Sequence, residues 1–344
     1  MTWRTSAEGP GGEAPDALFK RVRVSRRDEY TFVLKVAAAV LIACAGATLV
    51  LMHGRLGTTA GVVLLALIYT HMVELQHQCL HHSAFRRSSL HRPLGFLLGL
   101  PLLTAYSHYR TQHLQHHKFL GTSRDSEFFG FDTRAPLTLP TLARAMVSPA
   151  RLFQVCVDML ASCRGTWHYP MGTISPRAKR HVVVEYRLFA LAVAGAVALS
   201  LLGHGREVLL LWVAPLLLSV PIHFLLELPE HVLCDNDSTD VLRNTRTISG
   251  SRLSRWFTNG NNFHVEHHAA MVVPINRLAE RHAVAKRWAT HTEPSYPRFY
   301  LRVLREARRN TARENPLGQE GAGRRWPTDG DAAHEAGNGP DPPR

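Results

Sequence analysis

Four long apolar segments constrain the fold of this chain more than any other feature. About 20 apolar residues are needed for a helix to cross the hydrocarbon core of a bilayer. The first and last segments reach that length, the third is near the lower limit, and the second continues in helical register through Glu74. A buried core hairpin is the alternative for the first two. The segments cover residues 32–52, 60–73, 188–202 and 208–228.

Tight connections join these segments in pairs, HGRLGTT at residues 53–59 and GHGRE at residues 203–207. The sequence therefore predicts an all-α membrane protein with four transmembrane helices in two hairpins. A shorter apolar stretch at residues 94–105 is interrupted by Gly99 and Pro101, and it predicts an interfacial or re-entrant piece. Residues 106–187 are polar, basic and broken by prolines, which favours short interfacial helices.

The charge distribution indicates orientation. The net charge is +13, and basic residues gather beside the apolar segments, which favours an anionic membrane surface over nucleic acid as the partner. Connections on one side of the predicted hairpins carry few basic residues, Arg55 and Arg206. The positive-inside rule makes the opposite, histidine-rich side a cytoplasmic cap, and we expect an integral protein of a bacterial cell membrane. The predicted organisation is a disordered, basic segment at 1–30, one membrane domain at 31–305 and a disordered tail at 306–344.

Histidines recur in a spacing that places imidazoles on one helix face. Two triplets follow the pattern i, i+3, i+4, and a pair is spaced i, i+4. With 21 His in 344 residues, chance would supply only about 0.07 such triplets. Neutral imidazole is a common ligand for iron, zinc and copper. We therefore predict metal ligation by His77 and His81, by His113, His116 and His117, and by His264, His267 and His268.

Other residues are predicted around these motifs with weaker local signals. His82 follows His77 by five residues, about 140° round a helix, so it is the alternate to His81. His231 follows the last apolar segment at the membrane depth of His77, and we expect it to be the ninth ligand. Carboxylates often accept hydrogen bonds from ligand imidazoles. Candidates for such support are Asp125, Glu127 and Glu227, while Asn262 is expected to cap the helix that bears His264 or to hold a metal-bound water.

Eight or nine imidazoles suit two metal ions, because one structural zinc takes four ligands and a catalytic zinc about three. Sites made of nitrogen ligands without bridging carboxylates favour iron poised for O2, although ligand type alone leaves zinc open.

The stretches HQCLHHSAF, HLQHHKFLGTSRDSEF and NTRTISGSRLSRWFTNGNNFHVEHHAAMVVP resemble the histidine boxes of the membrane fatty-acid desaturase/hydroxylase superfamily. The resemblance covers about residues 70–279, and with EHVLCD it is nearest to the bacterial branch. It implies a non-haem di-iron centre, O2 as co-substrate and two electrons from a separate donor such as a ferredoxin and its reductase. The family's ligands correspond to the eight motif imidazoles, with His231 as the ninth. Gln78 and the doubled His81–His82 depart from the family's usual first box.

The implied reaction is oxidation of an unactivated C–H bond in a free or carrier-bound lipid or acyl chain. Desaturation is the first hypothesis, and hydroxylation of a lipid, sphingolipid-like or isoprenoid/carotenoid substrate is the second. The inner faces of the second and fourth spans are expected to wall the substrate channel. A remote alternative is an intramembrane zinc hydrolase, which would require HExxH, whereas Glu74 precedes the first His here. A haem carrier fits poorly, because these imidazoles cluster at predicted helix ends.

Overall fold

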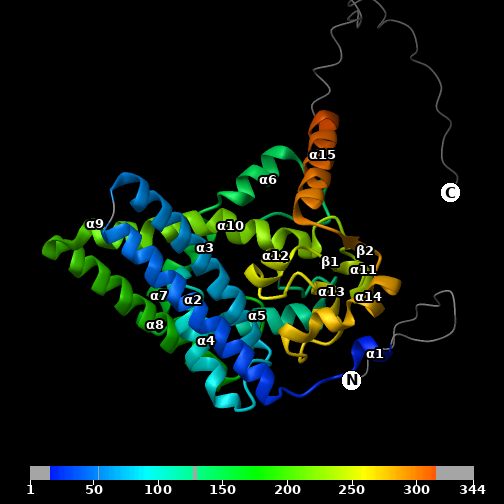
Figure 1. Cartoon of the computed structure of the whole chain (residues 1–344), viewed down its shortest axis with the longest axis horizontal. Helices are drawn as coiled ribbons and strands as arrows, with labels where there is room; N and C mark the ends of the chain where they lie inside the picture. Colours follow the sequence, from blue (N-terminus) through cyan, green and yellow to red (C-terminus); the bar gives the residue numbers. More distant parts are fainter. Residues whose placement is uncertain (1–15, 53, 127–129, 315–344) are drawn as a thin grey trace, which may run out of the picture.

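The structure is a computed structural model, and it describes residues 16–52, 54–126 and 130–314. Helices dominate the described residues, as predicted. Figure 1 shows long helices packed at one end of the molecule and short helices, with two strands, gathered at the other. The long helices are α2 (Arg26–Met52), α3 (Arg55–Leu80), α8 (Pro176–Leu199) and α10 (Ala214–His231).

Three helical segments of the described chain are long and apolar enough to cross a membrane: α2, α3 and a continuous run, Pro176–His231, of 56 residues. Between α8 and α10, this run contains two π-helical turns, η3 (Ser200–His204) and η4 (Leu209–Val213), around α9 (Gly205–Val208). Gly203 has φ of 100°, a left-handed conformation that suits glycine, and interrupts the helix there. Both views show the chain turning back at α9. The run covers the two segments that the sequence predicts as separate spans.

The first hairpin is held by a close approach of two glycines. A Cβ atom on Gly61 would lie 2.6 Å from the carbonyl oxygen of Gly46 and 2.7 Å from a methyl group of Val50. Small residues let membrane helices approach closely. The other side of α2 exposes large apolar side chains, such as Leu41 at 70%. An apolar surface of that extent is suited to lipid contact.

Short helices connect the long ones, as the sequence predicts. The stretch after α3 forms η1 (Ser88–Leu90), α4 (His91–Gly99) and η2 (Leu100–Leu102), and α4 is only 9 residues long, too short to span. The polar region that follows forms α5 (Tyr106–Phe119), α6 (Leu139–Met146), α7 (Ala150–Arg164) and the first turns of α8. Helix α5 packs against α3, α4 and α8.

The end of the molecule that holds the short helices and the strands is called the cap below. It contains a feature that the sequence does not predict, a parallel pair of three-residue strands. In register, Arg246 of β1 (Arg246–Ile248) pairs with His291 of β2 (His291–Glu293). Strands this short leave no periodic pattern in the sequence. The remaining cap elements are α11 (Val241–Asn244), α12 (Arg252–Phe257), α13 (His264–Ala269), η5 (Ile275–Arg281) and α14 (His282–Trp288).

Some residues of both segments that are predicted to be disordered form helices in the structure. At the N-terminal side, α1 (Asp16–Phe19) buries Leu18 in the cap beside Val265, and α2 already begins at Arg26. Residues 1–15 and 315–344 lie outside the described part of the chain.

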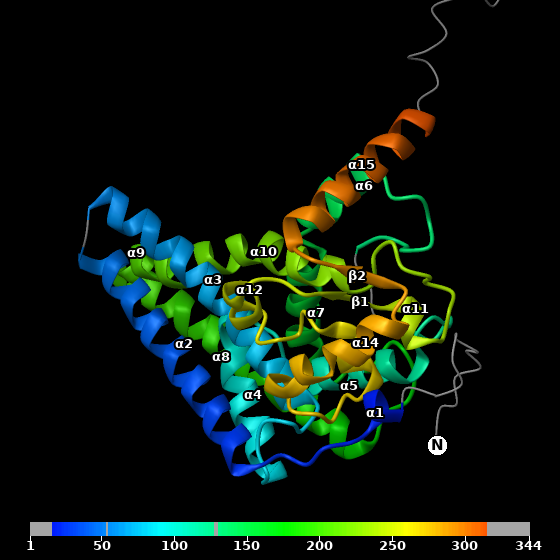
Figure 2. The same cartoon turned by 45° about the vertical axis from the view of Figure 1, so that its right-hand side comes forward.

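At the C-terminal side, α15 (Tyr296–Glu314) continues past residue 306, where the tail was predicted to begin. Its residues Phe299, Val303 and Ala307 are fully buried at helical spacing against a cluster that includes α6 and α10 residues. Figure 2 shows α15 projecting from the cap with α6 alongside. The many arginines of this helix led the sequence analysis to miss its apolar stripe.

Candidate metal centre

Four helices deliver the predicted imidazoles to one buried region. The C-terminal end of α3 supplies the first pair, α5 and α13 supply the triplets, and His231 is the last residue of α10. Eight imidazoles form two groups, and within each group the ligand atoms lie within 4.8 Å of one another. The first group is His77, His81, His113 and His267, and the second is His116, His231, His264 and His268.

His117, the remaining predicted ligand, adjoins the first group. Its Nε2 lies 3.0 Å from Nε2 of His113 and 3.1 Å from Nε2 of His267. The structure therefore gathers five imidazoles around the first site and four around the second.

His82, the alternate of the first motif, stands outside both groups. It follows the end of α3 with φ of 53°, is exposed, and stacks on His91 with ring centroids 4.6 Å apart. Its backbone has left the helix, so its side chain points away from the imidazoles that α3 presents. His81 is the member of the doubled pair that reaches the centre.

The converging ring nitrogens are arranged to bind a cation rather than to form hydrogen bonds with one another. Nε2 of His113 lies 2.7 Å from Nε2 of His77 and 3.0 Å from Nε2 of His117. A neutral imidazole nitrogen carries either one proton or one lone pair, and one N–H cannot point at two acceptors at once. Metal ions would let every converging nitrogen present a lone pair. The donor set thus fits two ions, one in each group.

Hydrogen bonds on the outer nitrogens set the required tautomer. Nδ1 of His116 lies 2.7 Å from Oδ1 of Asp125, as the sequence predicts, and Nδ1 of His231 lies 2.8 Å from the carbonyl oxygen of Asn244. Both oxygens accept a hydrogen bond from an Nδ1–H group, so the proton stays on Nδ1 and the Nε2 lone pairs face inward.

The other residues predicted to support the ligands behave differently. Oε2 of Glu227 lies 3.1 Å from Nδ1 of His223 rather than against His231, whose Nδ1 already contacts the Asn244 carbonyl. Asn262 does not cap α13, because Phe263 occupies the N-cap position, and its amide instead donates to the Ile248 carbonyl at 2.6 Å. Glu127 lies outside the described residues.

Burial keeps the imidazoles in the form that binds metal. Desolvation is the main cause that holds the pKa of several of these imidazoles well below the usual range of histidine, and repulsion between neighbouring imidazoles is the second cause. These groups are therefore neutral near pH 7. This applies outside the long helices to His81, His113, His117, His264, His267 and His268.

Two polar residues that position the ligands were not predicted. Glu266 is fully buried on the face of α13 opposite the motif, where it accepts from Thr247 Oγ1 at 2.5 Å and lies 2.8 Å from Nδ1 of His282. Arg246 donates to three carbonyls at the end of α10, among them that of Val232 at 2.6 Å, and so fixes the turn after His231. The sequence places Glu266 inside FHVEHH but gives no sign of its partners.

A cavity of about 520 Å³ reaches both groups from one side, because His113 and His116 are among its lining residues. Helix α10 contributes Val220 and Phe224, as expected for the fourth apolar segment. Among the described residues α3 contributes none to the lining of this cavity, although the second span is predicted to form a wall of the substrate channel. Helix α3 packs instead on α2, α4 and α10, and α5 and α7 line the cavity.

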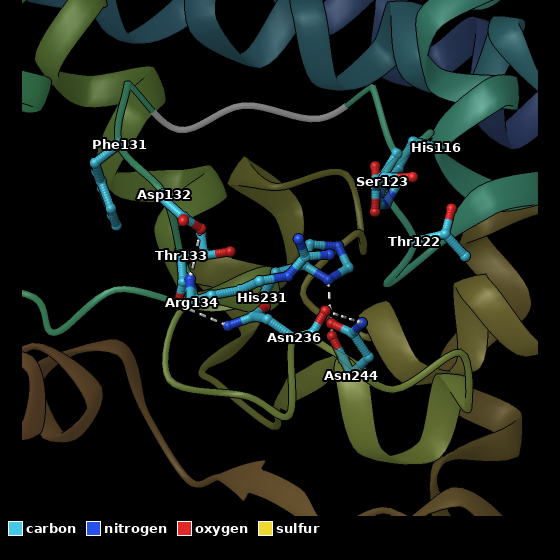
Figure 3. Close-up of a pocket in the computed structure, with 11 residues that line it drawn as sticks. His116, Thr122, Ser123, Phe131, Asp132, Thr133, Arg134, His231, Asn236 and Asn244 are labelled. Atoms are coloured by element: carbon cyan, nitrogen blue, oxygen red, sulfur yellow. Dashed lines mark hydrogen bonds and ion pairs between the residues drawn. The ribbon is translucent and has the colours of Figure 1, made fainter. Parts of the chain in front are cut away.

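A smaller hollow, about 160 Å³, approaches the second group from another side. Figure 3 shows His116 and His231 among the polar side chains that line it, including Thr133, Asn236 and Asn244. The second group therefore has a polar hollow on one side and the larger cavity on another.

The family model described as "Fatty acid desaturase" matches residues 55–300, a stretch that contains all nine imidazoles. The chain belongs to this family, which makes the protein an oxidoreductase that acts on a lipid substrate in a membrane setting. This result confirms the resemblance of the histidine boxes and sets the zinc hydrolase aside. A search of curated proteins found no match.

Proposed function

We propose that the protein is a membrane-embedded, O2-dependent di-iron oxidoreductase that desaturates the acyl chain of a lipid. The observation that carries this proposal is that both buried imidazole groups contribute to the lining of one cavity, His113 from the first group and His116 from the second. A single acyl chain in that cavity would present one stretch of C–H bonds to both metals.

The first iron would be held by five imidazoles and the second by four. Bound iron supplies O2 activation, with two electrons from a separate donor such as a ferredoxin and its reductase. The ligands of the first site would be His77, His81, His113, His117 and His267, and those of the second His116, His231, His264 and His268.

The residues around the cavity would bind and orient the substrate and would keep water away from it. Val155 of α7 and Phe224 of α10 present apolar surface to the cavity. The position of the acyl chain along these walls would select the carbon that faces the metals. The head group would lie toward the polar lining, where Arg151 donates to Thr104 Oγ1 at 2.6 Å.

The membrane topology that we propose has four crossings, α2, α3, α8 and α10, with the second reversal at Gly203. Exposed apolar side chains on the last two helices and their connection support this arrangement, such as Leu191 at 68% and Leu201 at 83%. All four crossings then place the imidazole groups at one membrane face. The basic flanks support our proposal that this face is cytoplasmic, in a bacterial cell membrane.

Product analysis tests the proposal and separates desaturation from hydroxylation. Lipids would be extracted from host cells with the wild-type gene, with the His267→Ala variant and without the gene, and compared by mass spectrometry. We expect a new double bond in the wild-type sample alone. An added hydroxyl that carries label from isotopic O2 would establish hydroxylation instead. Purified protein that is active without iron, or unimpaired turnover in the variant, would contradict a di-iron enzyme.

A further inference from the structure

With His117 the first site gathers five imidazoles and the second gathers four, and a carboxylate lies beside the second group. Oε2 of Glu230 lies 3.5 Å from Nε2 of His264, a member of the second group. The Glu230 side chain is 12% exposed. Glu230 directly precedes His231, and both lie in the last turn of α10.

A hydrogen bond orients the Glu230 carboxylate. The Asn261 amide donates to Oε1 at 2.7 Å, and the other oxygen, Oε2, faces His264. Asn261 is itself buried, with 3% of its surface exposed, so this orientation is fixed inside the protein.

The contact between Glu230 and His264 has the chemistry of two ligands that share an ion. Nε2 of His264 also lies 3.0 Å from Nε2 of His231, so it is one of the converging nitrogens. As a ligand it carries a lone pair, and a carboxylate oxygen beside it repels that lone pair unless a cation lies between them. Ligand nitrogens and oxygens at about 2.0–2.2 Å from one ion commonly lie about 3–3.5 Å from each other.

We propose that Glu230 is a carboxylate ligand of the second metal. The inference rests on the proposed di-iron function and refines it. The first metal has five imidazoles, whereas the second has four imidazoles and one carboxylate. The sequence-based expectation of sites made of nitrogen alone then holds for the first metal only. A carboxylate also neutralises one positive charge, so the two irons differ in electronic environment.

Mössbauer spectroscopy of protein loaded with the Mössbauer-active iron isotope tests this inference independently of turnover. We expect two distinct iron signals of equal area in the wild type. Glu230→Gln should change one signal, leave the other in place, and weaken retention of one of the two irons by at least about 10-fold. Glu227→Gln is the matched control, because this carboxylate lies on the same helix but contacts His223. It should leave both signals unchanged.

Each outcome has a separate meaning. A Glu230→Gln protein that keeps two irons with the wild-type spectrum would overturn the assignment of Glu230 and leave the di-iron proposal intact. A competent wild-type protein without iron would overturn the di-iron proposal itself. If Glu230→Gln does not fold, Glu230→Asp keeps the charge but withdraws the oxygen. In that variant, an unchanged spectrum counts against ligation, and a change in one signal alone supports it.

Discussion

Nε2 of His117 lies 3.1 Å from Nε2 of His267, although 150 residues separate the two in the chain. This contact joins the second histidine motif to the third. The His117 ring also stacks on His268 of the second group, with centroids 4.1 Å apart. His117 therefore lies where the two groups meet, and its removal should disturb the first site most directly.

Replacing His117 with Ala should weaken binding of one iron by at least about 10–100-fold, since this is the range for losing a group that only hydrogen-bonds to a ligand. The physical reason is the loss of one of the five imidazoles gathered around the first site, which are the first group and His117. Iron content after dialysis against a chelator measures the effect. His82→Ala is the control, because His82 is exposed and stacks on His91. Equal iron loss from both variants would argue against ligation by His117.

Asp125 provides a second test through a residue that touches no metal. Its carboxylate accepts from Nδ1 of His116 at 2.7 Å and from the backbone N–H of Gly121 at 3.2 Å. Asp125→Ala should lower the iron affinity of the second site by about 10–100-fold, because His116 loses its fixed tautomer.

The control for this variant is Asp132→Ala, which changes a carboxylate that lines the same hollow but accepts from the Arg134 backbone N–H. Competitive chelation would measure both affinities. If Asp132→Ala weakens iron binding as much as Asp125→Ala does, the effect is one of charge in the hollow rather than of the His116 tautomer.

The sequence identifies the imidazoles that the structure brings together, because their signal is local. Spacing of i, i+3, i+4 puts ligands on one face of a helix whatever the helix packs against. His231 lacks such a motif, and its prediction depended on membrane depth alone. Glu230, which precedes it, was not predicted as a site residue. Its carboxylate is oriented by Asn261, 31 residues away, and no local pattern in the sequence indicates such a contact.

Features that depend on distant contacts were missed for the same reason. The partners of Glu266 lie on β1 and α14, and Arg246 reaches back to carbonyls at the end of α10. The sequence predicts the inner faces of the second and fourth spans as channel walls, and of these only α10 lines the larger cavity, because α2, α4 and α10 pack on α3. Composition also led to the prediction of a disordered tail from residue 306, where arginines of α15 surround a buried apolar stripe that includes Phe299.

Narrowing the larger cavity should impair long substrates more than short ones. Val220 of α10 lines the cavity, and Val220→Trp would fill part of its volume of about 520 Å³. We expect kcat/KM for a long acyl chain to fall by about 10-fold or more, since overpacking costs about 1–3 kcal/mol. Leu217→Trp is the control, because Leu217 is 55% exposed on the same helix. Equal losses in the two variants would show that the cavity does not hold the chain.

The glycine contact between α2 and α3 should be needed for stability. Gly61→Ala places a Cβ 2.6 Å from the Gly46 carbonyl oxygen, so the helices must separate. We expect a loss of about 1–3 kcal/mol in the free energy of unfolding. Gly195→Ala, in α8, has open space around the new Cβ and should be neutral or stabilising by up to about 1 kcal/mol. Thermal denaturation in detergent compares the two, and a neutral Gly61→Ala would mean that this approach is dispensable.

The metal-free protein should lose stability as the pH falls below about 6.5, the ordinary pKa of histidine. Burial lowers the pKa of six imidazoles at the centre, so the folded state stays unprotonated while the unfolded chain takes up protons. The unfolded state then binds more protons, and the free energy of unfolding decreases with decreasing pH. Well below pH 6.5, where the unfolded imidazole is fully protonated, each such group adds up to about 1.4 kcal/mol per pH unit to the slope. Melting temperatures from about pH 7.5 to pH 5 measure it.

A variant with Ala at His264, His267 and His268 loses three of the six groups and should show a shallower slope. An unchanged slope would assign the acid sensitivity to groups outside the centre.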